Sequence, residues 1–125
     1  MTVLGIGGLL LRSRDPGARA AWYRDVLGIP AGEEGSDVVW MQDAGPTVFA
    51  PVSSATTDFA SDQPFLLNLR VTDLDAVVGR LESAGATVER RDEWETDYGR
   101  FVRLHDPEGL PLELWELPAD PSPQD

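Results

Sequence analysis

The feature that most constrains this chain is an order of structural elements that occurs twice along it. Asp15 and Asp73, 58 positions apart, each precede a run of apolar side chains at helical spacing, and Gly28 and Gly85 follow these runs. Aspartate accepts hydrogen bonds from a first helical turn, and glycine adopts the left-handed conformation that ends a helix. A strand-like segment precedes each helix and two follow it, so the sequence predicts an internal duplication.

The expected elements follow from side-chain periodicity and turn residues. Residues 53–62 are polar without periodicity and should form a linker, and the proline-rich residues 119–125 should form a disordered tail. We therefore expect a single domain over residues 1–118, with halves 3–52 and 63–118. Helices are expected between Asp15 and Gly28 and between Asp73 and Gly85, and strands at 3–13, 38–41, 48–50, 65–71, 100–105 and 112–117.

Composition excludes several classes of function. The 125 residues contain no cysteine and no lysine, so disulfides, thiolate ligands and a lysine nucleophile are excluded. A net charge of −12 repels phosphate backbones and anionic membranes, so neither nucleic acid nor a membrane is expected as a partner. Such acidity permits a cationic ligand but commonly serves solubility alone. With no basic leader and no apolar run of about 18 residues, we expect a cytoplasmic protein.

Three stretches together are similar to a known family. The first is DPGARAAWYRDVLGIP at 15–30. The second, at 73–86, begins with DLD and ends with GA, and the third, at 105–114, begins with HDPEG and ends with LEL. This pattern resembles the vicinal oxygen chelate superfamily, which includes glyoxalases, bleomycin-resistance proteins and dioxygenases. The resemblance implies an α+β fold in which two tandem βαβββ modules form a curved mixed sheet around a cavity. A second subunit commonly completes that cavity, so a homodimer is expected. A ferredoxin-like α+β dimer is the competing fold, and the duplicated order argues against it.

The resemblance also implies where a metal would bind. Metal-dependent members use four positions, which correspond here to Gly8, Phe49, Leu66 and Glu113. Only Glu113 can ligate a metal, whereas catalytic sites for iron, zinc or nickel need about three protein ligands. The single histidine, His105, precedes a hairpin turn and is interpreted as structural. A site shared by two subunits is opposed by the charge of Arg103 nearby. We therefore expect no metal and no cofactor.

Period-two alternation along the strands identifies side chains that would face the cavity. Trp40 and Trp115 could stack on an aromatic or conjugated ligand, and arginines could hold a carboxylate or enolate oxygen. The alternative is that these aromatics belong to the core and that the arginines extend to its rim. The candidate ligand-binding residues of the strands are Arg12, Trp40, Phe49, Asn68, Arg70, Arg103 and Trp115.

Two further features are candidates for function. Glu113 lies on an otherwise apolar strand, so burial without a partner would be costly. It could act as a general base or anchor a cationic ligand, or it could be paired with Arg12, Arg70 or Arg103. The acidic segment 93–99, with Trp94 and Tyr98, could form a lid that carries specificity.

Three functional hypotheses remain open from the sequence. The leading one is a metal-independent binding protein of the glyoxalase/bleomycin-resistance type. Such a protein would sequester an aromatic or cationic compound without converting it, as in antibiotic resistance. The second is a glyoxalase-like lyase or isomerase, or a dioxygenase-type enzyme, that uses Glu113 as its catalytic residue. The third is a structural module in which only dimerisation matters.

Overall fold

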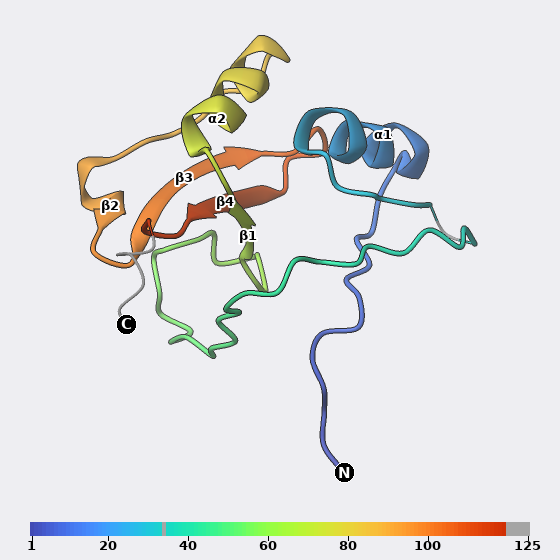
Figure 1. Ribbon diagram of the computed structural model, residues 1–125, viewed down its shortest axis with the longest axis horizontal. Coiled ribbons are helices and arrows are strands. Elements are labelled where there is room, and N and C mark those ends of the chain that lie inside the picture. The colour runs from blue at the N-terminus through green and yellow to red at the C-terminus, as the bar shows by residue number, and fades with distance from the viewer. Residues whose placement is uncertain (34, 120–125) are drawn as a thin grey trace.

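The computed structural model describes residues 1–33 and 35–119, and its architecture is mixed α+β. The helices and strands are α1 (Pro16–Leu27), β1 (Leu67–Val71), α2 (Leu74–Ser83), the 3₁₀ turn η1 (Asp92–Trp94), β2 (Glu95–Thr96), β3 (Gly99–His105) and β4 (Pro111–Glu116). The four strands form one curved, unclosed sheet in the order β1-β4-β3-β2, and both helices lie over the same face (Figure 1). β1 runs parallel to β4, while the other neighbouring strands are antiparallel.

The predicted ends of α1 are confirmed. The Asp15 carboxylate accepts a hydrogen bond from the Ala18 amide at 3.1 Å, and Pro16 occupies the first turn. Gly28 adopts φ 72°, and its amide bonds the carbonyls of the last turn. A helix of only three turns needs such caps, because its terminal amides and carbonyls have no partners within the helix.

The core lies between the sheet and α2. Its fully buried members are Leu74, Val78 and Leu81 from α2 and Leu112 and Leu114 from β4. α2 begins at the expected cap, Asp73, and the left-handed Gly85 follows it as predicted. The apolar residues of α2 recur at helical spacing, and those of β4 recur at every second position. Both patterns are visible in the sequence, and both sets of side chains pack into this core.

The strands expected in the first half are not formed. Residues 3–13, 38–41 and 48–50 are extended but contain no strand, so the prediction of strands there is wrong for the single chain. Within the described residues, positions 1–12 and 37–52 make no hydrogen bond between backbone groups. A strand exists only when a neighbour pairs with its backbone, and side-chain propensity does not supply that neighbour. In Figure 1 the N-terminal segment runs away from the sheet, whereas residues 38–50 pass below it without forming a strand.

The remaining segments follow the sequence more closely. Residues 53–62 form turns without helix or strand, and their role as a linker between two halves stays a prediction. The expected lid, 93–99, contains the end of η1 and the short strand β2. The expected disordered tail falls almost wholly on residues 120–125, outside the described residues. In the part of the chain that the structure describes, no helix is both long and apolar enough to cross a membrane.

Candidate functional site

The candidate site is the open face of the sheet, which we define as the face turned away from the helices. The alternate strand positions Leu67, Leu69, Val71, Leu112 and Leu114 pack into the core, as the period-two pattern predicts. Their neighbours therefore point to the other face. The open face carries two cross-strand rows, Asn68–Glu113–Arg103 and Arg70–Trp115–Phe101.

The first row is polar, and its charges are mutually paired. Glu113 accepts hydrogen bonds from Asn68 Nδ2 at 2.8 Å on one carboxylate oxygen and from Arg103 Nε at 3.0 Å on the other. The Glu113 side chain is 13% exposed. Such a buried carboxylate needs partners, and of the three arginines considered from the sequence, Arg103 provides one. A catalytic role for Glu113 stays a prediction.

The second row is aromatic and ends in a cation. The Phe101 and Trp115 rings are parallel, with centroids 5.8 Å apart, and Tyr98 approaches Phe101 edge-on. Trp115 Nε1 donates to the Tyr98 carbonyl at 2.9 Å. The indole also lies close against Gly99, at a point where any Cβ would collide with it. These contacts fix the orientation of the Trp115 ring.

Arg70 is held at the β1 end of the aromatic row by a loop from the first half. Its Nη2 donates to the Asp43 carbonyl at 2.9 Å. Gly45 lies against the guanidinium, where a Cβ could not be accommodated without displacement of Arg70. The guanidinium is therefore positioned by backbone groups and not by a carboxylate.

Arg103 connects three segments around the open face. Besides Glu113, it contacts the carbonyl of Asp58 in the linker, and its guanidinium lies 5.2 Å from the ring centre of Trp94 in η1. Arg91 approaches the same Trp94 ring at 5.0 Å. Cations over an indole face are attracted by the ring quadrupole. The predicted lid residue Trp94 thus reaches the edge of the polar row.

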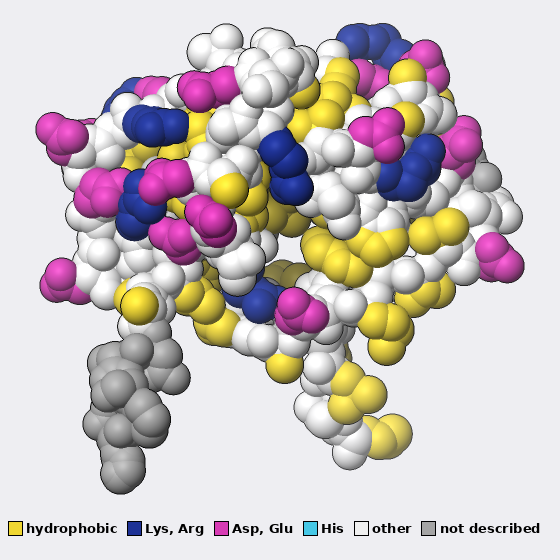
Figure 2. Space-filling view, turned by 45° about the horizontal axis from the view of Figure 1, so that its top comes forward, with side chains coloured by type: hydrophobic (Ala, Val, Ile, Leu, Met, Phe, Trp, Pro, Cys, Tyr) yellow, Lys and Arg dark blue, Asp and Glu magenta, His cyan; other side chains and the backbone are white. Residues whose placement is uncertain are grey.

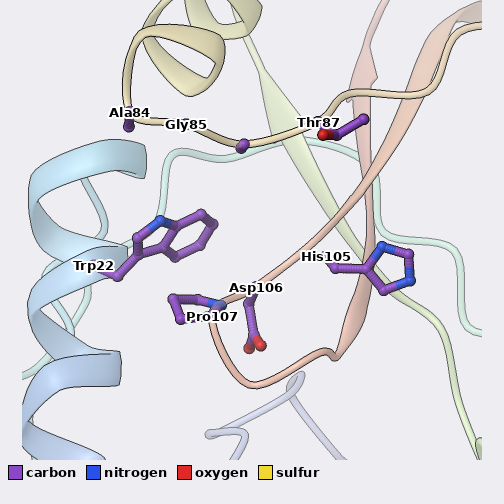
Figure 3. Close-up of a pocket in the computed structure, with 8 residues that line it drawn as sticks. Trp22, Ala84, Gly85, Thr87, His105, Asp106 and Pro107 are labelled. Carbon is purple, nitrogen blue, oxygen red and sulfur yellow. The ribbon is translucent and has the colours of Figure 1, made fainter.

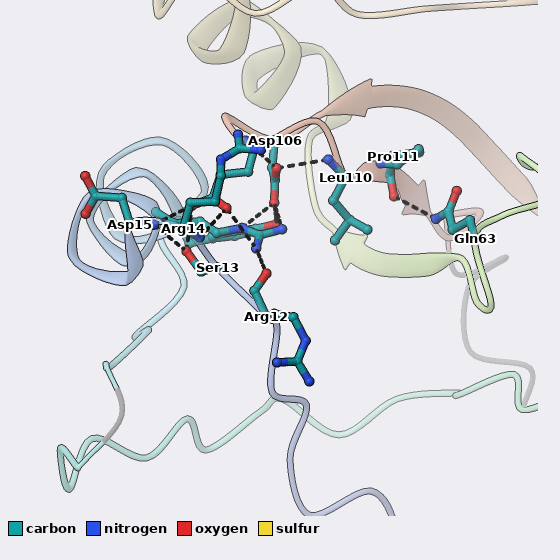
Figure 4. A network of polar contacts seen from close by, with 11 residues as sticks. Arg12, Ser13, Arg14, Asp15, Gln63, Asp106, Leu110 and Pro111 are labelled. Atoms are coloured by element: carbon teal, nitrogen blue, oxygen red, sulfur yellow. Dashed lines mark hydrogen bonds and ion pairs between the residues drawn. The ribbon is translucent and has the colours of Figure 1, made fainter.

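Three candidates from the first half do not join the open face in this single chain. Trp40 and Phe49 lie on extended segments and are 41% and 85% exposed. Arg12 contributes its carbonyl to Arg19 Nη1, while its side chain points away from the polar network around it (Figure 4). The sequence alternation therefore located the residues of the second half, and the positions of these three stay untested as binding residues.

The four family metal positions do not fit a metal in this chain. Gly8, Phe49 and Leu66 offer no side-chain ligand, and Glu113 is engaged by Asn68 and Arg103. Among the described residues, no three side chains of the ligating types His, Cys, Asp and Glu lie close enough to hold an ion.

Sequence reasoning missed a buried polar network between α1 and the β3–β4 turn (Figure 4). Asp106 accepts from Arg19 Nη2 at 2.6 Å and from the Tyr23 hydroxyl at 2.7 Å. Burial and the neighbouring Asp106 carboxylate raise the pKa of Tyr23. Glu108 accepts from the Ser13 hydroxyl and from the Arg14 and Asp15 amides. The one signal in the sequence was the pair of acids in the Asp-Pro-Glu-Gly turn between β3 and β4, which does not reveal the contact with α1.

Two cavities flank this network. One, of about 520 Å³, lies between α1, the end of α2 and the turn, with Trp22, Gly85 and Pro107 in its lining (Figure 3). The other, of about 690 Å³, has Arg12, Gln63 and Leu110 in its lining. His105 borders both cavities, and in Figure 3 its ring points away from Trp22. Neither lining contains a residue of the rows Asn68–Glu113–Arg103 and Arg70–Trp115–Phe101.

Together these features define the class of the protein as an α+β protein with a curved open sheet, two helices on one face and paired polar and aromatic rows on the other. The model of the glyoxalase-like domain family matches residues 8–115. The chain belongs to this family, within the vicinal oxygen chelate superfamily, and the resemblance seen in the sequence is confirmed. A comparison with curated proteins found no match.

Solved structures share the fold. TnmS3, an antibiotic binding protein from Streptomyces sp. CB03234, is 20% identical with a TM-score of 0.61, covering 94% of this chain and 99% of its own. The oxidase ChaP-H2 is 21% identical with a TM-score of 0.61, over 94% and 96% of the two chains. Lactoylglutathione lyase from Agrobacterium tumefaciens is 22% identical with a TM-score of 0.55, over 93% and 96%. At such identities, the likeness shows the fold alone.

Proposed function

We propose that this protein binds an aromatic small molecule on the open face of the sheet without a metal. The observation that carries the proposal is the fixed parallel pair Trp115–Phe101, which continues across β4 toward Arg70. Apolar flat surfaces with a few oriented polar groups are the usual composition of small-molecule sites. TnmS3 is described as an antibiotic binding protein, which makes a sequestering role in antibiotic resistance the hypothesis for this chain.

The proposal includes a homodimer, expected to be cytoplasmic. Of the sixteen large hydrophobic residues exposed in the described chain, thirteen lie within residues 1–52. Contiguous apolar surface of this kind marks an interface in soluble proteins. Figure 2 shows hydrophobic side chains gathered around a hollow in the middle of the view. We propose that a second copy of the chain covers this apolar surface, since the segments that carry it have no backbone partners within one chain.

The function is tested by the binding of 2-naphthamide, a neutral planar probe, measured by isothermal titration calorimetry. Saturable binding is expected, and Trp115→Leu should weaken it about 2- to 13-fold, because stacking on an indole is worth about 0.5–1.5 kcal/mol beyond the buried area. Trp22→Leu, which changes an indole outside the open face, is the matched control and should retain wild-type affinity. The melting temperature of each variant reports whether it is folded.

Either of two results would contradict the proposed site. One is the absence of saturable binding of 2-naphthamide or of its charged analogues by the wild-type protein. The other is equal affinity of the wild type and a folded Trp115→Leu variant. Chemical conversion of a bound probe, seen by mass spectrometry and abolished in Glu113→Gln, would instead favour the glyoxalase-like lyase, isomerase or dioxygenase-type enzyme.

A further inference from the structure

We infer that the ligand of the open face is a planar aromatic anion whose acidic group binds Arg70, an inference that rests on the proposed function. The charges of the face support an anion over a cation. Glu113 and Arg103 form an ion pair at 3.0 Å and neutralise each other. Arg70 forms no ion pair within the described residues, since the contact that holds it is the Asp43 backbone carbonyl. The six side chains of the two rows therefore carry one uncompensated positive charge.

This local charge is notable because the chain as a whole carries a net charge of −12. A cationic aromatic ligand would be attracted by the distant field of the molecule. Among the six side chains of the two rows, however, it would meet the guanidinium of Arg70 and no unpaired carboxylate, because Glu113 is bound to Arg103. Short-range contacts outweigh screened long-range fields at physiological salt, where the Debye length is about 8 Å. The aromatic anion is thus the class of ligand that this face fits.

The register of the sheet places Arg70 beside Trp115, on the neighbouring strand. β4 lies between β1 and β3, so Phe101 and Arg70 flank Trp115 on opposite sides. Phe101 covers one side of the indole, and the other side faces the strand that carries Arg70. Neighbouring strands are about 4.8 Å apart. An aromatic ring placed on the β1 side of Trp115 would therefore hold a ring-bound carboxylate or enolate oxygen within reach of Arg70.

The guanidinium is also prepared for binding. A guanidinium presents five N–H donors in a planar fork, and the Asp43 carbonyl engages Nη2 of Arg70. Gly45 packs against the same guanidinium. Less conformational entropy is lost on binding when a charged group is already fixed. Arg70 is consequently suited to bind a carboxylate with two parallel hydrogen bonds.

The test compares three probes with one ring system, which are 2-naphthoate, 2-naphthamide and 2-naphthylmethylammonium. Wild-type protein should bind the naphthoate about 10- to 100-fold more tightly than the amide, as expected for a hydrogen bond to a charged group. The ammonium probe should bind most weakly. Arg70→Gln should remove the preference for the naphthoate and leave the affinity for the amide within about twofold. Arg70→Lys, which keeps the charge but not the fork, should retain part of the preference.

Arg80→Gln is the matched control, because Arg80 lies exposed on α2, on the helical side of the sheet. It removes the same charge and should preserve the preference for the naphthoate. Equal affinities for naphthoate and amide, tighter binding of the ammonium probe, or an unchanged preference in Arg70→Gln would overturn the inference while leaving the proposed function intact. Failure of all three probes to bind wild-type protein would instead overturn the proposed function itself.

Discussion

At the scale of single residues, Asp106 determines how α1 attaches to the second half of the chain. One of its oxygens accepts from Arg19 and Tyr23, and the other accepts from the Glu108 and Leu110 amides. The Asp106 side chain is fully buried and that of Arg19 is 8% exposed. Since every bond of this carboxylate joins α1 to the turn or closes the turn itself, its loss affects both elements.

Asp106→Asn should destabilise the protein strongly. The substitution removes the charge that compensates the buried Arg19, and breaking a buried ion pair in this way costs about 3–5 kcal/mol. Urea unfolding followed by circular dichroism measures the loss. Asp75→Asn is the control, because Asp75 pairs with Arg100 at 3.1 Å on the surface and its removal should cost less than about 1 kcal/mol. Equal losses in the two variants would show that the Asp106 network is not a structural centre.

Glu108 gives the same region a pH dependence. Its bonds to Ser13 and to the Arg14 and Asp15 amides hold its pKa at about 2, below the usual 4.5. A depressed pKa contributes stability above pH 4.5, and this contribution is lost as the pH falls from about 4.5 toward 2. Glu108→Gln should therefore lower the unfolding free energy at pH 7 and show a shallower decline below pH 4.5.

Thermal unfolding between pH 2 and pH 7 measures this difference. Glu82→Gln, at an exposed position of α2, removes one carboxylate without disturbing the network and serves as the reference. The wild type and Glu82→Gln should lose stability in parallel below pH 4.5. A Glu108→Gln curve parallel to both would mean that Glu108 does not contribute to the acid sensitivity.

At the scale of elements, the boundaries of helices and strands that depend on neighbouring residues could be predicted from the sequence. Asp15, Gly28 and Asp73 act through bonds within one or two turns, so the helix boundaries were predictable. β1, β3 and β4 were predictable within two residues at either end because alternation and the Asp106–Gly109 turn mark them. The strands of the first half were not, since their pairing partners are not encoded by their own residues.

The same distinction explains the candidate site. Asn68, Arg70, Arg103, Glu113 and Trp115 were assigned to one face by period-two alternation, and the cross-strand register brings them into two rows. The pairing of Glu113 with Arg103 could only be considered as one of three options. The network around Asp106 was missed, because contacts between positions about 90 residues apart follow from packing and leave no periodic trace.

At the scale of the whole molecule, all four strands lie in the second half of the chain, and the first half contains α1 and two extended segments. Residues 1–12 and 37–52, 28 positions in all, combine exposed apolar side chains with backbone groups that have no backbone partner among the described residues. β1 has one neighbour, β4, and so forms an edge of the sheet. A stable interface uses about 20–30 residues from each side, a number that these segments can supply. The edge strand β1 and the extended segments both have backbone groups that could pair with a strand of a second copy.

The proposed homodimer predicts a sedimenting mass near twice the chain's 13.6 kDa at micromolar concentration. Leu10→Glu should shift the equilibrium to the monomer, because Leu10 is 91% exposed in the single chain and a charge there would be buried at the interface. Leu117→Glu places the same charge on a large exposed residue outside these segments and should leave the dimer intact. Wild-type protein that sediments as a monomer, or a Leu10→Glu variant as dimeric as Leu117→Glu, would mean that the segments are covered by something other than a second copy.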